Sequence, residues 1–250
     1  MSKVLAAIDN STVAGPVLAT AFAVADVLHS DVEALHVRED GDGRASAAAH
    51  AAGVVLREIA GPTAQSLVRA AEDREVSALV LGARGFPVGR RPAGHVALEV
   101  ITSLKKPLVV VPPEVRLPIR LRRALVPLDG TRVTATALGE TIELVRGSDV
   151  EVVALHVFDR ESPPLIADQP HHELDAWGRE FLARYCRHGV RLEARVGVAG
   201  EHVLDVAAEA DADLIALGWA QDLSPGRAAV VREVLARSRV PVLLVPLVDA

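Results

Sequence analysis

The sequence predicts two consecutive α/β domains, each a doubly wound sheet of five parallel strands. Three observations lead to this prediction. Strand-like and helix-like segments alternate along the chain, the same landmarks occur twice in the same order, and half of the 250 residues are hydrophobic while only 3% are aromatic. A composition dominated by Ala, Val, Leu and Ile suits parallel strands that are buried on both faces under Ala-rich helices.

Each half of the chain contains five short, β-branched and continuously apolar segments, as buried parallel strands do. In the first half they lie near 3–9, 32–37, 53–59, 77–82 and 107–111, and in the second near 122–129, 150–157, 190–196, 212–218 and 241–246. The intervening segments show helical spacing of apolar residues, for example Leu67, Val68 and Ala71. Alternating strands and helices imply right-handed crossovers and a parallel sheet.

The landmarks of the first half recur in the second. The tetrapeptide Ala-Leu-His-Val at 34–37 returns at 154–157, an offset of 120, and the Leu-Gly pair at 81–82 returns at 217–218, an offset of 136. An ordered series of this kind indicates a duplication. We therefore expect domains over residues 1–113 and 120–247, joined by a stretch that Pro112, Pro113 and Pro118 punctuate.

The two copies differ in length between their second and third strands. The change of offset from 120 to 136 gives the second copy 16 more residues there. We expect them to form a full helix over 171–186, whereas the first half has room for about two helical turns near 44–52.

Charge and cysteine content exclude several classes of protein. The net charge of −6 argues against nucleic acid as the main partner. The single cysteine, Cys186, excludes an internal disulfide and a multi-cysteine metal site. The chain begins with a strand-like segment in place of a signal peptide, and no apolar run approaches the length of a membrane span. We expect a cytoplasmic chain without a membrane partner.

Several matched features resemble the universal stress protein family, once in each half. They are a first strand ending in Asp (Asp9, Asp129), a second ending in Leu-His-Val, a fourth ending in Gly (Gly82, Gly218), a closing apolar strand after Pro, and the segment 94–101. The resemblance implies Rossmann-like domains of the adenine nucleotide alpha hydrolase type, with strand order 3-2-1-4-5. It also implies that the two fifth strands pair as an intramolecular version of the family's dimer. Further association into a homodimer is left open.

Nucleotide-binding members of this family carry the loop Gly-x2-Gly-x9-Gly-Ser/Thr at the crevice between strands one and four, where open α/β sheets place ligands. Gly82, Gly85 and Gly94 match its glycines, although eight residues separate the last two, and His95 takes the hydroxyl position. Glycines let main-chain amides approach phosphates. The resemblance thus implies a site for ATP or another adenine nucleotide formed by Asp9, Val37, Gly82, Arg84, Gly85, Gly94 and His95. Two alternatives remain: the glycines serve turns only, and Asp9 is an ordinary device at the start of a helix.

The corresponding loop of the second half departs from the pattern. Gln221 replaces the second glycine, the helix-start pair becomes Ala228-Ala229, and Asp222 would repel phosphate. Ser224 followed by Pro225 is typical of a helix cap with Pro at the first helical position. We therefore expect no nucleotide in this half, and structural roles for Asp129 and Val157.

No catalytic constellation is apparent. His36 and His156 lie within matching strands, where a hydrogen-bonded core histidine is the expected role. There is no Walker A loop, no dinucleotide-binding Gly-x-Gly-x-x-Gly and no nucleophile elbow. We expect a stress-response protein that is not an enzyme and that senses or buffers a nucleotide through its first half. The alternative is an interaction module that binds no nucleotide and acts on a partner protein.

Overall fold

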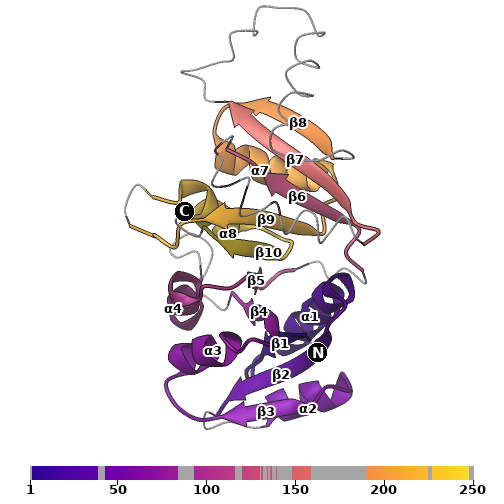
Figure 1. The fold of residues 1–250 in the computed structure, drawn as a ribbon, viewed down its shortest axis with the longest axis vertical. Helices are drawn as coiled ribbons and strands as arrows, with labels where there is room; N and C mark the ends of the chain where they lie inside the picture. The colour runs from indigo at the N-terminus through magenta and orange to yellow at the C-terminus, as the bar shows by residue number, and fades with distance from the viewer. Residues whose placement is uncertain are drawn as a thin grey trace, which may run out of the picture.

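The computed structural model describes residues 2–38, 43–83, 93–115, 120–129, 131, 134, 136, 139, 148–158, 190–224 and 227–247. Within these residues, ten strands form a single sheet that runs from one end of the molecule to the other (Figure 1). We call residues up to 115 the first half and residues from 120 onward the second half.

In the first half the described strands and helices alternate as the sequence predicts. The first half contains β1 (Lys3–Ala7), α1 (Ala14–Leu28), β2 (Asp31–Val37), α2 (Arg44–Ala51), β3 (Leu56–Ile59), α3 (Thr63–Ala71), β4 (Val76–Gly82), α4 (His95–Ser103) and β5 (Leu108–Val111). The second contains β6 (Arg123–Pro127), β7 (Glu151–Phe158), β8 (Arg191–Val196), α7 (Ala199–Glu209), β9 (Leu214–Trp219), α8 (Ala229–Arg237) and β10 (Val242–Pro246). The α/β class is confirmed, and so are the short helix near 44–52 and all ten strands. The helix expected over 171–186 lies outside the described residues.

The strand order is β3-β2-β1-β4-β5-β10-β9-β6-β7-β8, so each half has the order 3-2-1-4-5. Neighbouring strands are parallel except at the junction of the halves, where β5 and β10 pair antiparallel. Leu243 lies opposite Val109 in this pairing. The prediction that the two fifth strands pair within the chain is therefore confirmed.

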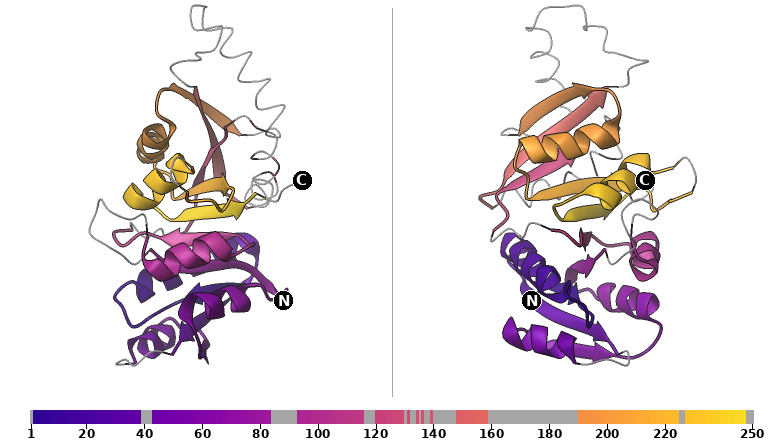
Figure 2. Two further views of the ribbon diagram at one scale, coloured as in Figure 1. Left: turned by 90° about the vertical axis from the view of Figure 1, so that its left-hand side faces the viewer. Right: turned by 180° about the vertical axis from the view of Figure 1, so that it is seen from behind.

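Helices cover both faces of the sheet (Figure 2). In the first half, α1 and α2 pack on one face, where Val4 and Val80 are fully buried, and α3 and α4 pack on the other, over Leu5 and Leu79. In the second half, α7 and α8 lie on the same face as α3 and α4. This alternation of faces makes the fold doubly wound.

One strand begins later than predicted. The segment near 53–59 was expected to be extended throughout, but Gly53 has a φ of 67° and ends α2. The N–H of Val54 donates to the carbonyl of Ala49 at 3.0 Å, which closes the last helical turn. Because the chain must leave this left-handed turn first, β3 starts only at Leu56. Among the described helices, none combines the length and the apolar character that a membrane crossing requires.

Candidate functional site

A cavity of about 210 Å³ opens at the carboxyl ends of β1 and β4. Five of the seven residues predicted for the nucleotide site line it, namely Asp9, Val37, Gly82, Gly94 and His95. The other two, Arg84 and Gly85, lie outside the described residues. Residues that are up to 86 positions apart in the sequence (9 to 95) therefore meet at one site.

The topology explains why the cavity forms here. β1 and β4 are adjacent and parallel, so both end at the same edge of the sheet. From this edge the chain continues into α1 on one face and into α4 on the other, and the two helices diverge (Figure 1). A crevice at such a switch point is where open α/β sheets bind ligands.

Asp9 both shapes the first loop and borders the cavity. Its Oδ1 accepts the N–H of Ser11 at 2.9 Å, and the Ser11 hydroxyl accepts the N–H of Val13 at 3.3 Å. These bonds turn the chain from β1 into α1. The turn-forming role is thus present, and Asp9 is also one of the residues that line the cavity.

Gly82 allows α1 to approach the end of β4 closely. A Cβ at this position would lie 3.1 Å from Cγ1 of Val13 and 3.6 Å from Cγ2 of Val17. Contacts as short as the first are unfavourable, so a side chain here would push the start of α1 away from the sheet. Val13 and Val17 both line the cavity, and the glycine therefore sets its width.

The N-terminus of α4 forms the opposite wall. Gly94 is the N-cap residue and has no side chain with which to cap the helix, while residues 94–97 all line the cavity. The His95 ring is 85% exposed and its Nε2 lies 3.9 Å from Oε2 of Glu99. The helix therefore presents main-chain amides and its positive dipole end to the cavity, and the ring stays in solvent at the rim.

Several residues of the cavity wall were not predicted from the sequence. Thr63 is the first residue of α3, and Leu67 lies one turn further along the same helix. Ser11 was part of the matched Asp9-Asn10-Ser11 segment but was not assigned to the site. The start of α3 lies at the same sheet edge as the starts of α1 and α4, which was the available signal for Thr63.

The two strand histidines have equivalent structural partners. Nδ1 of His36 lies 3.0 Å from the carbonyl oxygen of Ile8, and Nδ1 of His156 lies 2.8 Å from that of Leu128. Each ring thus satisfies the carbonyl just beyond the first strand of its half. His36 is 6% exposed and has the expected role of a hydrogen-bonded core residue, whereas His156 is hydrogen-bonded but only partly buried. No group of three or more potential metal ligands occurs among the described residues.

Asp129, the counterpart of Asp9, is held by local hydrogen bonds. Its carboxylate accepts the N–H and the hydroxyl of Thr131, both at 2.8 Å, and the hydroxyl of Thr134 at 3.1 Å. Three local bonds occupy both oxygens of this side chain. The structural role expected for Asp129 is confirmed.

The loop after β9 differs from the prediction in one respect. The expectation that Ser224 caps the next helix is wrong, because α8 begins at Ala229 with Ala228 as its N-cap residue. The N–H of Ser224 donates to Oδ1 of Asp222 at 2.8 Å, and its hydroxyl bonds the same oxygen. These bonds lower the pKa of Asp222.

The Ser224 hydroxyl is thus held in a local turn and takes no part in starting α8. The pair Ala228-Ala229 does start the helix, as the alignment of the two halves predicts.

A model of the universal stress protein family matches residues 40–112 and 120–246. A universal stress protein from Archaeoglobus fulgidus superposes with a TM-score of 0.70 at 21% identity, over 98% of each chain. A protein of unknown function from Pseudomonas aeruginosa superposes with a TM-score of 0.71 at 13% identity, over 98% of this chain and 92% of that one. No sequence among curated proteins matches the chain. The solved structures share its fold.

Proposed function

Because the chain belongs to the universal stress protein family, we propose that its first half binds an adenine nucleotide such as ATP in the cavity between β1 and β4. We further propose that this binding, and not catalysis, is how the protein acts. The observation that supports the proposal most is the convergence of Asp9, Val37, Gly82 and the start of α4 on one cavity.

The start of α4 suits the phosphates. The first amides of a helix lack partners within the helix, and the aligned peptide dipoles add partial positive charge at this end. The N-cap residue Gly94 has no side chain, so it does not itself compete with an anion for these amides. Phosphate groups bind readily at helix N-termini of this kind.

The other walls suit a nucleoside. Val13, Val17 and Leu67 supply apolar surface for a base, and the main chain of Val37 lies at the end of β2. The carboxylate of Asp9 is an acceptor for ribose hydroxyls. Because about 210 Å³ is below the roughly 300–1,000 Å³ typical of ligand pockets, part of the nucleotide would extend beyond the cavity, with its phosphates at the N-terminus of α4.

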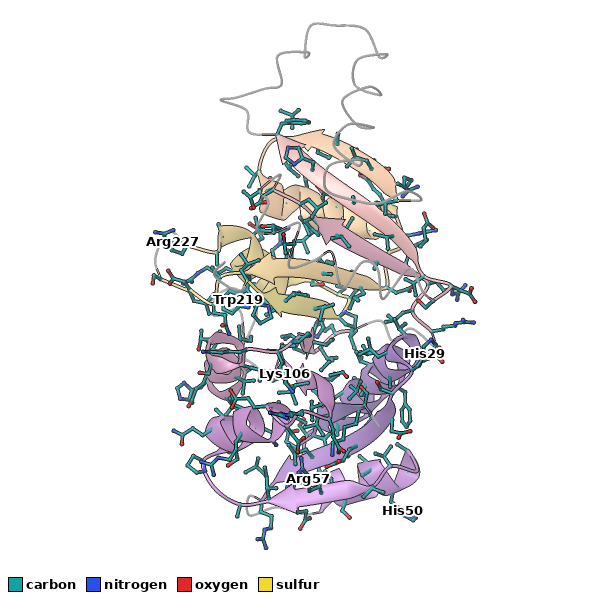
Figure 3. All side chains as sticks on the ribbon, viewed as in Figure 1. His29, His50, Arg57, Lys106, Trp219 and Arg227 are labelled. Atoms are coloured by element: carbon teal, nitrogen blue, oxygen red, sulfur yellow. The ribbon has the colours of Figure 1, made fainter. Side chains whose placement is uncertain are left out.

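The second half lacks the same provisions. Asp129 is engaged with Thr131 and Thr134, and the large ring of Trp219, which ends β9 and is labelled in Figure 3, is buried where the first half has the small Ala83. Ala228 begins α8 in the left-handed conformation, with a φ of 50°. We therefore propose one nucleotide site in each chain.

Calorimetric titration of the full chain with ATP tests this proposal. The expected result is saturable binding with a stoichiometry near one per chain. Separate competition experiments with adenosine and with tripolyphosphate would show how much of the ATP affinity comes from the nucleoside and how much from the phosphates. The proposal fails if no saturable binding is found below about 1 mM, the concentration at which binding free energy is only about −4 kcal/mol.

A further inference from the structure

A second cavity, of about 350 Å³, lies at the junction of the two halves, on the face of the sheet that α1 covers. We call it the junction cavity. Its floor includes Val109 of β5 and Leu243 of β10, which lie opposite one another in the antiparallel pairing. Val24, Val27 and Leu28, near the end of α1, form one wall. The junction cavity is thus separate from the one at the start of α4.

The second half supplies the facing wall. Leu121, Ala124 and Val150 belong to or directly precede β6 and β7, and all three side chains are apolar. Both halves are therefore needed to form the junction cavity, which neither half would contain alone.

The polar groups of the junction cavity are confined to one end. Ser2 and Ser77 line it, and their hydroxyls bond one another, while Ser2 also lies 2.9 Å from the hydroxyl of Ser30. None of the described lining residues is charged. An apolar body with a single hydroxyl-rich end is complementary to a neutral ligand with one polar group.

Several apolar side chains that line the junction cavity keep a small exposed fraction. Val24, Val27, Val150 and Leu243 remain 7–9% exposed, whereas Val80 on the same face is fully buried. The junction cavity is open to solvent, and its volume of about 350 Å³ lies within the roughly 300–1,000 Å³ that is typical of ligand pockets. Such pockets are lined mainly by apolar side chains with a few polar groups, as this one is.

We propose that the junction cavity binds a small, neutral, mainly aliphatic ligand whose one hydroxyl or carbonyl group bonds Ser2 or Ser77. Its apolar part lies between α1 and the start of β6, over the pairing of Val109 with Leu243. Such a ligand contacts both halves at once, and so it stabilises their junction. This site is independent of nucleotide binding.

The test uses the neutral fluorescent probe N-phenyl-1-naphthylamine and the full chain. We expect saturable binding of the probe, displacement by 1-octanol, and little displacement by octanoate, whose charge has no partner among the described lining residues. Absence of saturable binding overturns the proposal. Displacement by octanoate as strong as by 1-octanol overturns the neutral ligand class. Displacement by ATP would show that the probe occupies the nucleotide cavity, and would also overturn the assignment.

Variants locate the probe. Two variants place a larger side chain into the junction cavity: Ala124→Leu from the second half and Ala78→Leu from the first. Each should weaken probe binding about tenfold. Ala47→Leu, an exposed position on α2, is the matched control and should leave binding unchanged. Ser77→Ala should weaken 1-octanol about three- to tenfold, the range expected for one hydrogen bond, and leave the probe unaffected. If the two leucine variants fold and bind the probe as tightly as the wild type, the proposal is wrong.

Discussion

The side-chain amide of Gln221 donates a hydrogen bond to the main-chain carbonyl of Leu104 at 2.6 Å, across the junction of the two halves. Leu104 is the C-cap residue of α4, the helix whose N-terminus borders the nucleotide cavity. Gln221 has a φ of 57° at the position that aligns with Gly85 of the first half. The second-half loop, which has Gln221 in place of a glycine, thus caps α4 of the first half at its C-terminal end.

Two substitutions of Gln221 distinguish the stabilisation by its hydrogen bond to Leu104 from the cost of its left-handed backbone. Gln221→Ala removes the bond and keeps a non-glycine residue in the left-handed region, so we expect it to lower the free energy of unfolding by about 1 kcal/mol. Gln221→Gly also removes the bond but relieves a left-handed conformation that costs roughly 1–2 kcal/mol. Chemical denaturation should therefore find the glycine variant close to wild type or above it. Equal loss in both variants would contradict this interpretation.

We expect even the smallest side chain at position 82, that of alanine, to lower the stability of the fold. The Cβ in Gly82→Ala would lie 3.1 Å from Val13 and displace the start of α1. We expect a loss of about 1–3 kcal/mol in the free energy of unfolding, together with weaker ATP binding. Gly15→Ala is the matched control, because nothing lies within 4 Å of its Cβ and alanine favours the helix it occupies. Thermal unfolding should rank Gly15→Ala above wild type and Gly82→Ala below it.

The strand histidines should behave alike. Replacing either His36 or His156 with Phe leaves a carbonyl oxygen, of Ile8 or Leu128, without its donor. We expect each variant to lose about 1–3 kcal/mol of unfolding free energy. His50→Phe, at an exposed position of α2, should change it by no more than about 0.5 kcal/mol. A His36 variant as stable as the wild type would show that this hydrogen bond contributes nothing.

Two lysines should titrate in a fixed order. The hydrogen bond from Lys3 to Glu33, at 2.8 Å, raises the pKa of Lys3 above its ordinary value of 10.5, whereas burial lowers the pKa of Lys106 below it. The Lys3 pair therefore stabilises the fold below about pH 10.5, and this contribution is lost as pH rises through the folded-state pKa. The chain has only three lysines, so NMR titration of their Cε signals can resolve each one. A pKa for Lys106 above that of Lys3 would contradict the assigned contacts.

The strand and helix pattern was predictable because it depends on local apolar periodicity. The equivalence of the halves was also predictable, because the two Leu-His-Val segments recur at an offset of 120 residues. Thr63 was not predicted because it follows β3, whereas the family's loop pattern points only to the ends of β1, β2 and β4. The role of Ser224 was predicted wrongly, because its hydroxyl bonds the nearby carboxylate of Asp222 and the helix begins only at Ala229. Capping residues and turn residues are the same residue types, and sequence spacing alone does not separate them.

The most direct test of nucleotide binding by the first half compares ATP titrations of Gly94→Asp and Ala228→Asp. These positions are the N-cap residues of α4 and α8. Gly94 is extended, the conformation in which Asp caps a helix, and Asp tolerates the left-handed conformation at position 228 better than Ala does, so neither variant should lose stability. A carboxylate at position 94 would occupy the phosphate-facing helix start and repel ATP, whereas one at position 228 would not. We predict ATP affinity at least about tenfold weaker in Gly94→Asp and unchanged in Ala228→Asp. Equal affinity in wild type and Gly94→Asp, or a loss confined to Ala228→Asp, would contradict nucleotide binding at the start of α4.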